Sequence, residues 1–438
     1  MRFAHALVAL LAVSAPVAFA APRCKIAIDM PKPKDGGGFA CGEKIDVRIR
    51  VLCDGKAVAT NAWVALDNWG PGVVRKAAVE KIPAEGLLVR GVTLDRPGCL
   101  RCEVRIRERH ALASVPFEPQ AIRSGSPLPP DFMDWWRGEI ARLDATVPAE
   151  VELTPWATAA TNRFDCWRVR CPTAGGKSVH GLLTVPKDRS KGPFPVHVSV
   201  PGAGIGEPYD QSKIGYAHWP DNGRVRLTIF AHCAQIDIPE VRREYAERML
   251  KEHREKYGLK GNYVVAGISE SREAYHYYPI ILGANRLVNW LVRQPYSDPR
   301  DVIYSGTSQG GGMGLVLSAL NPSFTRVFLN VPAMCDTMGS LQGRQSGWPQ
   351  PVESQSEANK AAAARNAPYF DGANFAARIT CPVRVAVGFA DTTCAPCAVY
   401  AAYNQIKVAD KGIVHGFGMG HGCFGEFYKE LGKWLRGK

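Results

Sequence analysis

From about residue 149 onward, short apolar segments alternate with segments of helical periodicity. Eight apolar segments are candidate strands: 163–171, 178–186, 194–202, 224–231, 301–306, 326–332, 383–390 and 413–420. Helical spacing of apolar residues runs from Ile280 to Leu291 and from Phe427 to Leu435. Apolar strands that follow helices in this way indicate an α/β fold with a mostly parallel sheet covered on both faces. The first two segments predict a leading hairpin.

The preceding residues, 24–119, have a period of two instead. In KIDVRIRV, residues 44–51, isoleucine and valine alternate with charged residues, and CEVRIR, residues 102–107, repeats the pattern. Such alternation is typical of half-buried antiparallel strands, so we expect a small all-β, immunoglobulin-like sandwich in front of the α/β unit. Trp63 and Trp69 are candidate sugar-stacking residues there, although lone tryptophans more often belong to the core.

The chain divides into four parts on this interpretation. Residues 1–20 form a signal peptide, 24–119 the sandwich, 120–148 a linker with a leading helix, and 149–438 the catalytic domain. SGSPLPP, residues 124–130, has the composition of a linker. After it, DFMDWWRGEIARL, residues 131–143, has aromatic residues at helical spacing and Asp131 as a candidate cap.

The N-terminus predicts export. Residues 1–20 combine a positive start, a short apolar middle and Ala18-Phe19-Ala20 as a small-residue cleavage site. No later stretch is apolar for about 20 residues, so we expect a periplasmic or secreted protein without stable membrane insertion. The formal net charge is +13, but basic and acidic residues are interleaved, as in RREYAERMLKEHREK, residues 242–256. Nucleic acid is therefore not an expected partner.

The sequence contains 13 cysteines, an odd number that an exported chain would use partly in disulfides. Cys99 with Cys102 and Cys394 with Cys397 have CxxC spacing. Zinc would need a second well-spaced pair or neighbouring histidines, and these are missing, so no metal site is expected. Local disulfides, including one between Cys166 and Cys171, are the simpler interpretation.

YSGTSQGGGMG, residues 304–314, lies between a candidate strand and a candidate helix. Within it, residues 306–310 fit G-x-S-x-G, in which small residues allow a sharp turn that lifts the Ser308 hydroxyl clear of the backbone. The turn places the Gln309 N–H beside any oxyanion formed at the serine. A second donor is expected in VPGAGIG, after the third core strand, at Ala203 or Gly204.

A nucleophilic serine needs a base and an acid. In α/β folds with a G-x-S-x-G turn, these two residues follow at the ends of later strands. Asp391 follows the strand 383–390, and His421 follows the strand 413–420. His421 would accept the Ser308 proton, and Asp391 would orient the imidazole. His415, within a candidate strand, is the alternative base, and Asp336, after the strand 326–332, is the alternative acid.

These motifs resemble a known family. SGTSQGGGMG (305–314), VPAMCD (331–336), DTTCAPCAVYAAYNQI (391–406) and GHG (420–422) are together similar to the acetyl xylan esterase and cephalosporin C deacetylase group, carbohydrate esterase family seven. PPDFMDWWRGEIARL (129–143) and YHYYPIILGANRLVNWL (275–291) are similar as well. The likeness covers roughly residues 130–437. It implies an α/β-hydrolase fold, a triad of Ser308, Asp391 and His421, and oxyanion donors at Gln309 and Ala203.

The resemblance further implies deacetylation of sugar esters without a cofactor, and assembly into homo-oligomers. The chain departs from the family where TIFAHCAQ, residues 228–235, lacks the usual arginine, where Ala203 replaces an aromatic residue, and where Gly422 replaces a glutamate. The sequence thus predicts an exported serine esterase acting on acetylated carbohydrate. The alternatives are a serine peptidase of the prolyl-oligopeptidase type and a non-catalytic glycan-binding protein on a hydrolase scaffold.

Overall fold

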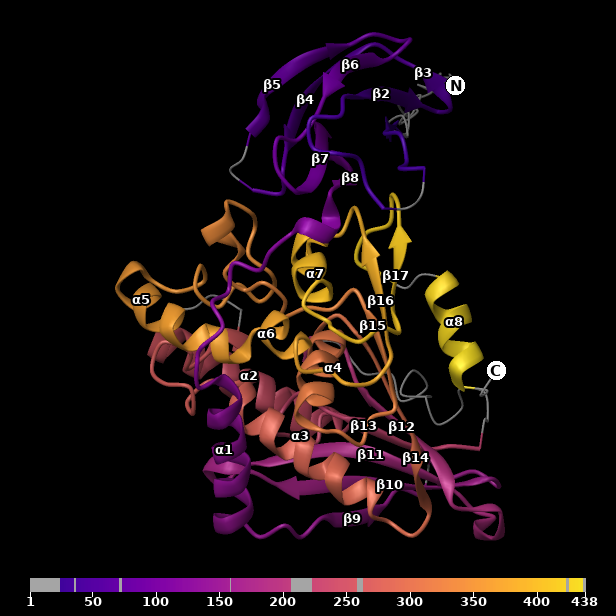
Figure 1. The fold of residues 1–438 in the computed structure, drawn as a ribbon, viewed down its shortest axis with the longest axis vertical. Helices are drawn as coiled ribbons and strands as arrows, with labels where there is room; N and C mark the ends of the chain where they lie inside the picture. The colour runs from indigo at the N-terminus through magenta and orange to yellow at the C-terminus, as the bar shows by residue number, and fades with distance from the viewer. Residues whose placement is uncertain are drawn as a thin grey trace, which may run out of the picture.

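A nine-stranded sheet runs through the larger part of the molecule in the computed structural model (Figure 1). The structure describes residues 24–34, 37–70, 73–157, 159–205, 223–257, 263–422 and 425–435. The expected signal peptide therefore lies outside the described residues. Within the described ranges, no helix combines the length and the apolar character that crossing a bilayer requires.

The strands of the large sheet are β9 (Glu152–Pro155), β10 (Phe164–Pro172), β11 (Ser178–Pro186), β12 (Phe194–Val200), β13 (Val225–Ile229), β14 (Ser297–Thr307), β15 (Arg326–Asn330), β16 (Val383–Gly388) and β17 (Lys411–Gly416). The α-helices are α1 (Phe132–Thr146), α2 (Pro239–Tyr257), α3 (Tyr277–Val292), α4 (Gln309–Leu320), α5 (Glu357–Asn366), α6 (Gly372–Ala376), α7 (Pro396–Tyr403) and α8 (Gly425–Leu435).

The order of the sheet is β17-β16-β15-β14-β12-β13-β11-β10-β9. Its strands from β13 to β17 pair in parallel, whereas β9, β10 and β11 are antiparallel. In Figure 1, α3 and α4 lie on one side of the sheet and α8 lies on the other. All eight candidate strands and the leading hairpin are confirmed, because apolar runs of this kind fit strands buried on both faces. Only the exposed strand β9 was not expected.

The N-terminal β region, residues 24–117, contains eight strands in two further sheets. They are β1 (Cys24–Asp29), β2 (Ile45–Cys53), β3 (Lys56–Ala57), β4 (Thr60–Asp67), β5 (Val73–Ile82), β6 (Leu87–Val92), β7 (Gly98–Ile106) and β8 (Arg109–Phe117). One sheet joins β1, β2, β3 and β6, and the other has the order β5-β4-β7-β8. The strands are antiparallel, and a hydrophobic cluster of their own lies between them.

The two candidate sugar-stacking tryptophans differ in exposure. Trp69 is completely buried, with the Arg101 guanidinium over its ring, so it cannot stack on a sugar. Trp63 is half-buried, and the guanidinium of Arg105 covers its ring with 4.6 Å between the guanidinium carbon and the ring centroid. The prediction of a stacking role is wrong for Trp69, because its side chain is core.

Residues 124–127 of the segment 124–130 are bound to the α/β unit, so the segment is not a free linker. Gly125 N–H donates to the buried Asp336 carboxylate at 2.6 Å, and the Ser126 hydroxyl donates to the buried Asp371. Asp131 occupies the N-cap of α1 but makes no side-chain cap bond; it accepts from the Tyr369 hydroxyl instead. The prediction that the Asp131 carboxylate caps the helix is therefore wrong.

Helix α1 packs its aromatic face on the α/β unit, as its spacing predicts. Trp136 is fully buried, and its indole N–H donates to the Tyr369 carbonyl at 2.9 Å. Phe132 meets Phe375 edge to face, with ring centroids 4.8 Å apart. The helix is thus part of the same hydrophobic core as the sheet.

Replacing Trp136 with alanine should lower the free energy of unfolding by about 3–5 kcal/mol, because the substitution leaves a large cavity and an unpaired carbonyl. Denaturant unfolding measures the loss. Trp135→Ala is the matched control: that ring is half-buried and stacks under Arg272, so its removal should cost clearly less. Equal losses for both variants would contradict this account of the core.

The cysteines contradict the expectation of local disulfides. The structure has one disulfide among the described residues, Cys24–Cys53 between β1 and β2, and the other described cysteines are thiols. Cys166 and Cys171 lie on one strand, β10, five residues apart. Residues an odd number apart on a strand point to opposite faces, so these two cannot bond, and the same holds for Cys99 and Cys102 on β7.

Candidate active site

Ser308 lies in the sharp turn between β14 and α4, with φ 58° and ψ −119°. The two flanking glycines explain why the turn needs this motif. A Cβ at Gly306 would lie 2.4 Å from backbone atoms of Gly310, and a Cβ at Gly310 would lie 2.0 Å from the Val200 carbonyl oxygen. Only glycine fits at both places, so the sequence pattern is a direct requirement of the turn.

Hydrogen bonds of the backbone fix the strained serine in place. Ser308 N–H donates to the Asn330 carbonyl at 2.9 Å. The Ser308 carbonyl accepts from Gly312 N–H at 3.0 Å and from Ala333 N–H at 2.9 Å. Because these partners belong to α4 and to the end of β15, the turn is held by both of its neighbours and keeps its positive φ.

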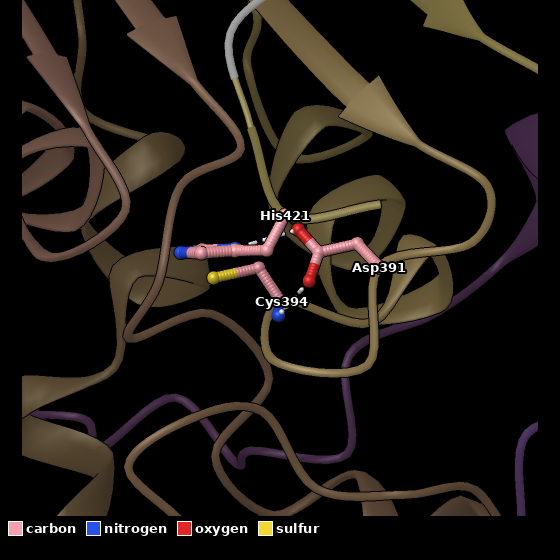
Figure 2. A group of neighbouring side chains, drawn as sticks. All are labelled: Asp391, Cys394 and His421. Atoms are coloured by element: carbon pink, nitrogen blue, oxygen red, sulfur yellow. Dashed lines mark hydrogen bonds and ion pairs between the residues drawn. The ribbon is translucent and has the colours of Figure 1, made fainter. Parts of the chain in front are cut away.

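The structure brings Ser308, His421 and Asp391 together in one hydrogen-bonded chain. His421 Nε2 lies 3.0 Å from Ser308 Oγ, and His421 Nδ1 lies 2.9 Å from Asp391 Oδ2. Figure 2 shows the Asp391 carboxylate directed at the ring. Since a carboxylate accepts, we assign the ring proton to Nδ1, which leaves Nε2 to accept from the serine hydroxyl. This arrangement can remove a proton from Ser308.

Asp391 is itself held firmly. Its side chain is completely buried, and its Oδ1 accepts from Thr393 N–H and Cys394 N–H, each at 2.8 Å. The second oxygen, Oδ2, is therefore the one that faces His421. The imidazole of His421 is 33% exposed, which leaves its outer edge accessible to a substrate.

The hydrogen bond that His421 donates to Asp391 raises the pKa of the imidazole above its ordinary value of 6.5, and burial opposes the shift. A raised pKa keeps the imidazole protonated to higher pH, and a protonated ring cannot accept the serine proton. We therefore expect the acid limb of the kcat/KM profile to lie above pH 6.5. Asp391→Asn removes the largest cause of the shift, so the limb should move to lower pH. A limb that stays in place in this variant would contradict the assignment.

Neither competitor is directed at Ser308. His415 Nε2 pairs with the Tyr400 hydroxyl at 2.5 Å, and burial lowers the pKa of His415. Asp336 accepts from the Arg344 guanidinium at 2.9 Å and from Gly125 N–H. Both side chains stabilise the fold around the site, and both are already occupied there.

The two expected oxyanion donors lie on the segments that the sequence indicates. Gln309 is the first residue of α4, so its backbone N–H needs no partner within the helix. Ala203 and Gly204 lie in the loop after β12 and are exposed, with φ 132° at Gly204. The Gln309 side chain links this loop to the helix, since its Nε2 donates to the Pro201 carbonyl at 3.4 Å.

Three further residues support the site and were not expected from the sequence. Tyr277, at the start of α3, donates its hydroxyl to Gln309 Oε1 at 2.7 Å. Asn330, buried at the end of β15, donates from Nδ2 to the Gly422 carbonyl at 3.1 Å, beside the base. Cys394 has its sulfur within 4.8 Å of a carboxylate oxygen of Asp391 and a ring nitrogen of His421. For Asn330, the available signal was a polar residue at the end of a candidate strand.

Asn330→Ala should lower kcat for ester hydrolysis by about 10-fold with little change in KM, because the loop carrying His421 loses its tether. Steady-state kinetics on a soluble acetyl ester measure this. Asn321→Ala is the matched control. Asn321 is also buried, but it lies at the C-terminal end of α4, where its amide donates to Asn285 and Asn289 of α3. A control that loses as much kcat as Asn330→Ala would show that general destabilisation is responsible.

Asp391, Cys394 and His421 also offer one possible metal ligand each, with these atoms all within 4.8 Å of one another (Figure 2). Their chemistry fits a metal poorly. Both Asp391 oxygens are engaged by hydrogen bonds, and burial raises the pKa of the Cys394 thiol well above its ordinary value of 9.0. A thiol that stays protonated is a weak metal ligand and also a weak competitor of Ser308 as nucleophile.

Known proteins share this architecture. The chain superimposes on an acetyl xylan esterase from Paenibacillus sp. R4 with a TM-score of 0.61 and 20% identity, over 73% of this chain and 98% of that one. Acetyl xylan esterase 1 from Thermoanaerobacterium sp. JW/SL YS485 gives a TM-score of 0.59 and 20% identity, over 73% and 97%. These likenesses establish the α/β-hydrolase fold.

Sequence comparison is more specific. Acetyl esterase Axe7A of Xylanibacter ruminicola is 28% identical over 385 residues, which are 86% of this chain and 82% of that protein. The protein is a carboxylic ester hydrolase. Residues 114–437 match the acetyl xylan esterase (AXE1) family, to which the chain belongs. The expected resemblance is thus confirmed, and the peptidase and non-catalytic alternatives lose their support.

Proposed function

We propose that this chain is an exported serine esterase that removes acetyl groups from plant or algal polysaccharide, or from oligosaccharides released from it. The hydrogen-bonded chain from Ser308 through His421 to Asp391 is the observation that carries the proposal. Its order and its position at strand ends are those of an α/β-hydrolase triad. Family membership favours an ester as the substrate.

The proposed reaction has two steps. Ser308 Oγ attacks the acetyl carbonyl while His421 Nε2 accepts its proton, and the backbone N–H groups of Gln309 and Ala203 stabilise the oxyanion. The sugar hydroxyl leaves with the proton from His421, which produces an acetyl-enzyme. Water, deprotonated by the same imidazole, then releases acetate and restores the serine. No cofactor takes part in either step.

The carbohydrate follows from the relatives. Two structurally similar proteins are acetyl xylan esterases, and the relative from Xylanibacter ruminicola is an acetyl esterase. We therefore propose acetylated carbohydrate as the substrate. Acetate release from acetylated xylan, mannan, pectin and algal polymers tests this directly. We expect release from at least one polymer; cleavage of peptide amides without any acetate release would overturn the proposal.

Export, domain structure and assembly belong to the same proposal. The first 20 residues are taken as a signal peptide, so protein recovered from the periplasm or the medium should begin after Ala20. Residues 24–119 are taken as a separate immunoglobulin-like sandwich, which the hydrophobic cluster within its two sheets supports. The family resemblance implies a homo-oligomer, and sedimentation of the purified protein would measure its state.

A further inference from the structure

The N-terminal β region contacts the segment that carries Asp391. The Ser114 hydroxyl of β8 donates to the Phe389 carbonyl, two residues before the acid. The Trp69 carbonyl accepts from Gln345 N–H at 2.5 Å, and the Gln345 side chain donates to the Thr392 carbonyl at 3.4 Å. The acid segment is therefore supported from the β region on both sides of Asp391.

A third contact joins two cysteine side chains. Cys99 is the second residue of β7, and Cys397 is the second residue of α7, the helix that follows the acid segment. Strand β7 and helix α7 are in contact, and both side chains belong to one buried cluster, with exposures of 0% and 1%. Burial, and after it the neighbouring Cys397 thiol, raise the pKa of the Cys99 thiol. Two sulfur atoms from distant parts of the chain thus meet in a dry interface.

The neighbouring cysteines have other surroundings. Cys102, three residues along β7, points to the opposite face and belongs to the core of the β region. The Cys394 sulfur lies beside Asp391 and His421. Cys335 donates to the Ala333 carbonyl at 3.3 Å. Each CxxC spacing in the sequence is therefore divided, and one cysteine of each pair meets at the interface between β7 and α7.

We propose that Cys99 and Cys397 are a disulfide-forming pair that locks the N-terminal β region onto the acid segment. Both thiols lose a proton, a bond forms between the two Sγ atoms, and the two electrons pass to a disulfide oxidant such as oxidised glutathione, which becomes two thiols. Burial raises the pKa of the Cys99 thiol well above its ordinary value, so exchange is slow after docking. The bond therefore forms as the two parts come together during folding.

Peptide mapping tests the pair without reference to catalysis. The full chain is refolded with oxidised and reduced glutathione until Cys24 and Cys53 are fully linked, then blocked with N-ethylmaleimide and digested with trypsin. Trypsin separates Cys99 (peptide 91–101) from Cys102, and releases Cys397 in peptide 385–407. We expect these two peptides to be covalently linked through Cys397, with Cys394, which peptide 385–407 also contains, alkylated in the fragment spectra. Alkylated Cys99 and Cys397, or a link from either to another cysteine peptide, would overturn the proposal.

Thermal unfolding gives a second measurement. In a Cys24→Ser/Cys53→Ser background, reduction should lower Tm by about 5 °C when Cys99 and Cys397 are both present. Adding Cys397→Ser should abolish this dependence on reductant. Cys41→Ser, at a half-buried thiol near Glu118, is the matched control and should preserve it. A dependence on reductant that survives Cys397→Ser would contradict the pairing.

Discussion

Ser308→Ala should lower kcat for acetyl ester hydrolysis by at least about 10⁴-fold while the protein remains folded. The hydroxyl is the only reacting group that the substitution removes, and His421 and Asp391 keep their mutual hydrogen bond. The residual rate would come from the oxyanion donors and from substrate positioning. Acetate release by purified protein, with Tm measured alongside, provides the test.

Ser305→Ala is the matched control for this variant. Ser305 lies on β14, three residues before Ser308, and its hydroxyl pairs with His197 at 2.7 Å. Its loss should change stability slightly and leave kcat within a few-fold of the wild type. Turnover that survives Ser308→Ala, or that disappears equally in Ser305→Ala, would be incompatible with Ser308 as the nucleophile.

Asp391→Asn should lower kcat by about 10⁴-fold. An amide cannot hold the proton on Nδ1 of His421 as a carboxylate does, and it does not stabilise the imidazolium that forms when Ser308 loses its proton. Asp391 also accepts from two backbone N–H groups of its own turn, so some loss of stability should accompany the loss of rate. Kinetics and thermal unfolding of one preparation separate the two effects.

Asp336→Asn distinguishes the two residues, Asp391 and Asp336, that the sequence offers as the acid of the triad. Asp336 is equally buried, but it pairs with Arg344 and with the backbone of Gly125. Breaking this buried pair should lower stability by about 3–5 kcal/mol and leave kcat of the folded fraction near the wild-type value. If Asp336→Asn reduced kcat more than Asp391→Asn, the order of the proposed triad would be wrong.

Much of the catalytic unit could be predicted because its signals are local. Strands buried on both faces are rich in apolar residues, as are β12, β16 and residues 302–304 of β14. The turn at Ser308 needs glycine on both sides, which the motif records directly. Parallel strands also end at one edge, so residues that follow β16 and β17 had to approach the serine.

The remaining features depend on contacts between distant segments. The composition of residues 124–130 is that of a linker, yet buried carboxylates at Asp336 and Asp371 bind this segment. The burial of Trp69 under Arg101 is a contact between separate segments, which the sequence around the tryptophan does not indicate. Cysteine spacing wrongly predicted local disulfides, because the pleat of β7 and β10 directs the paired thiols to opposite faces of the sheet.

Covalent labelling is the most direct test of the central claim that Ser308, His421 and Asp391 act as one catalytic unit. The wild-type protein is treated with a serine-directed phosphonate, and the modified residue is identified by mass spectrometry. We predict a single adduct, on Ser308, and its loss in His421→Ala. Failure to label Ser308, or equal labelling with and without the imidazole, would contradict the account.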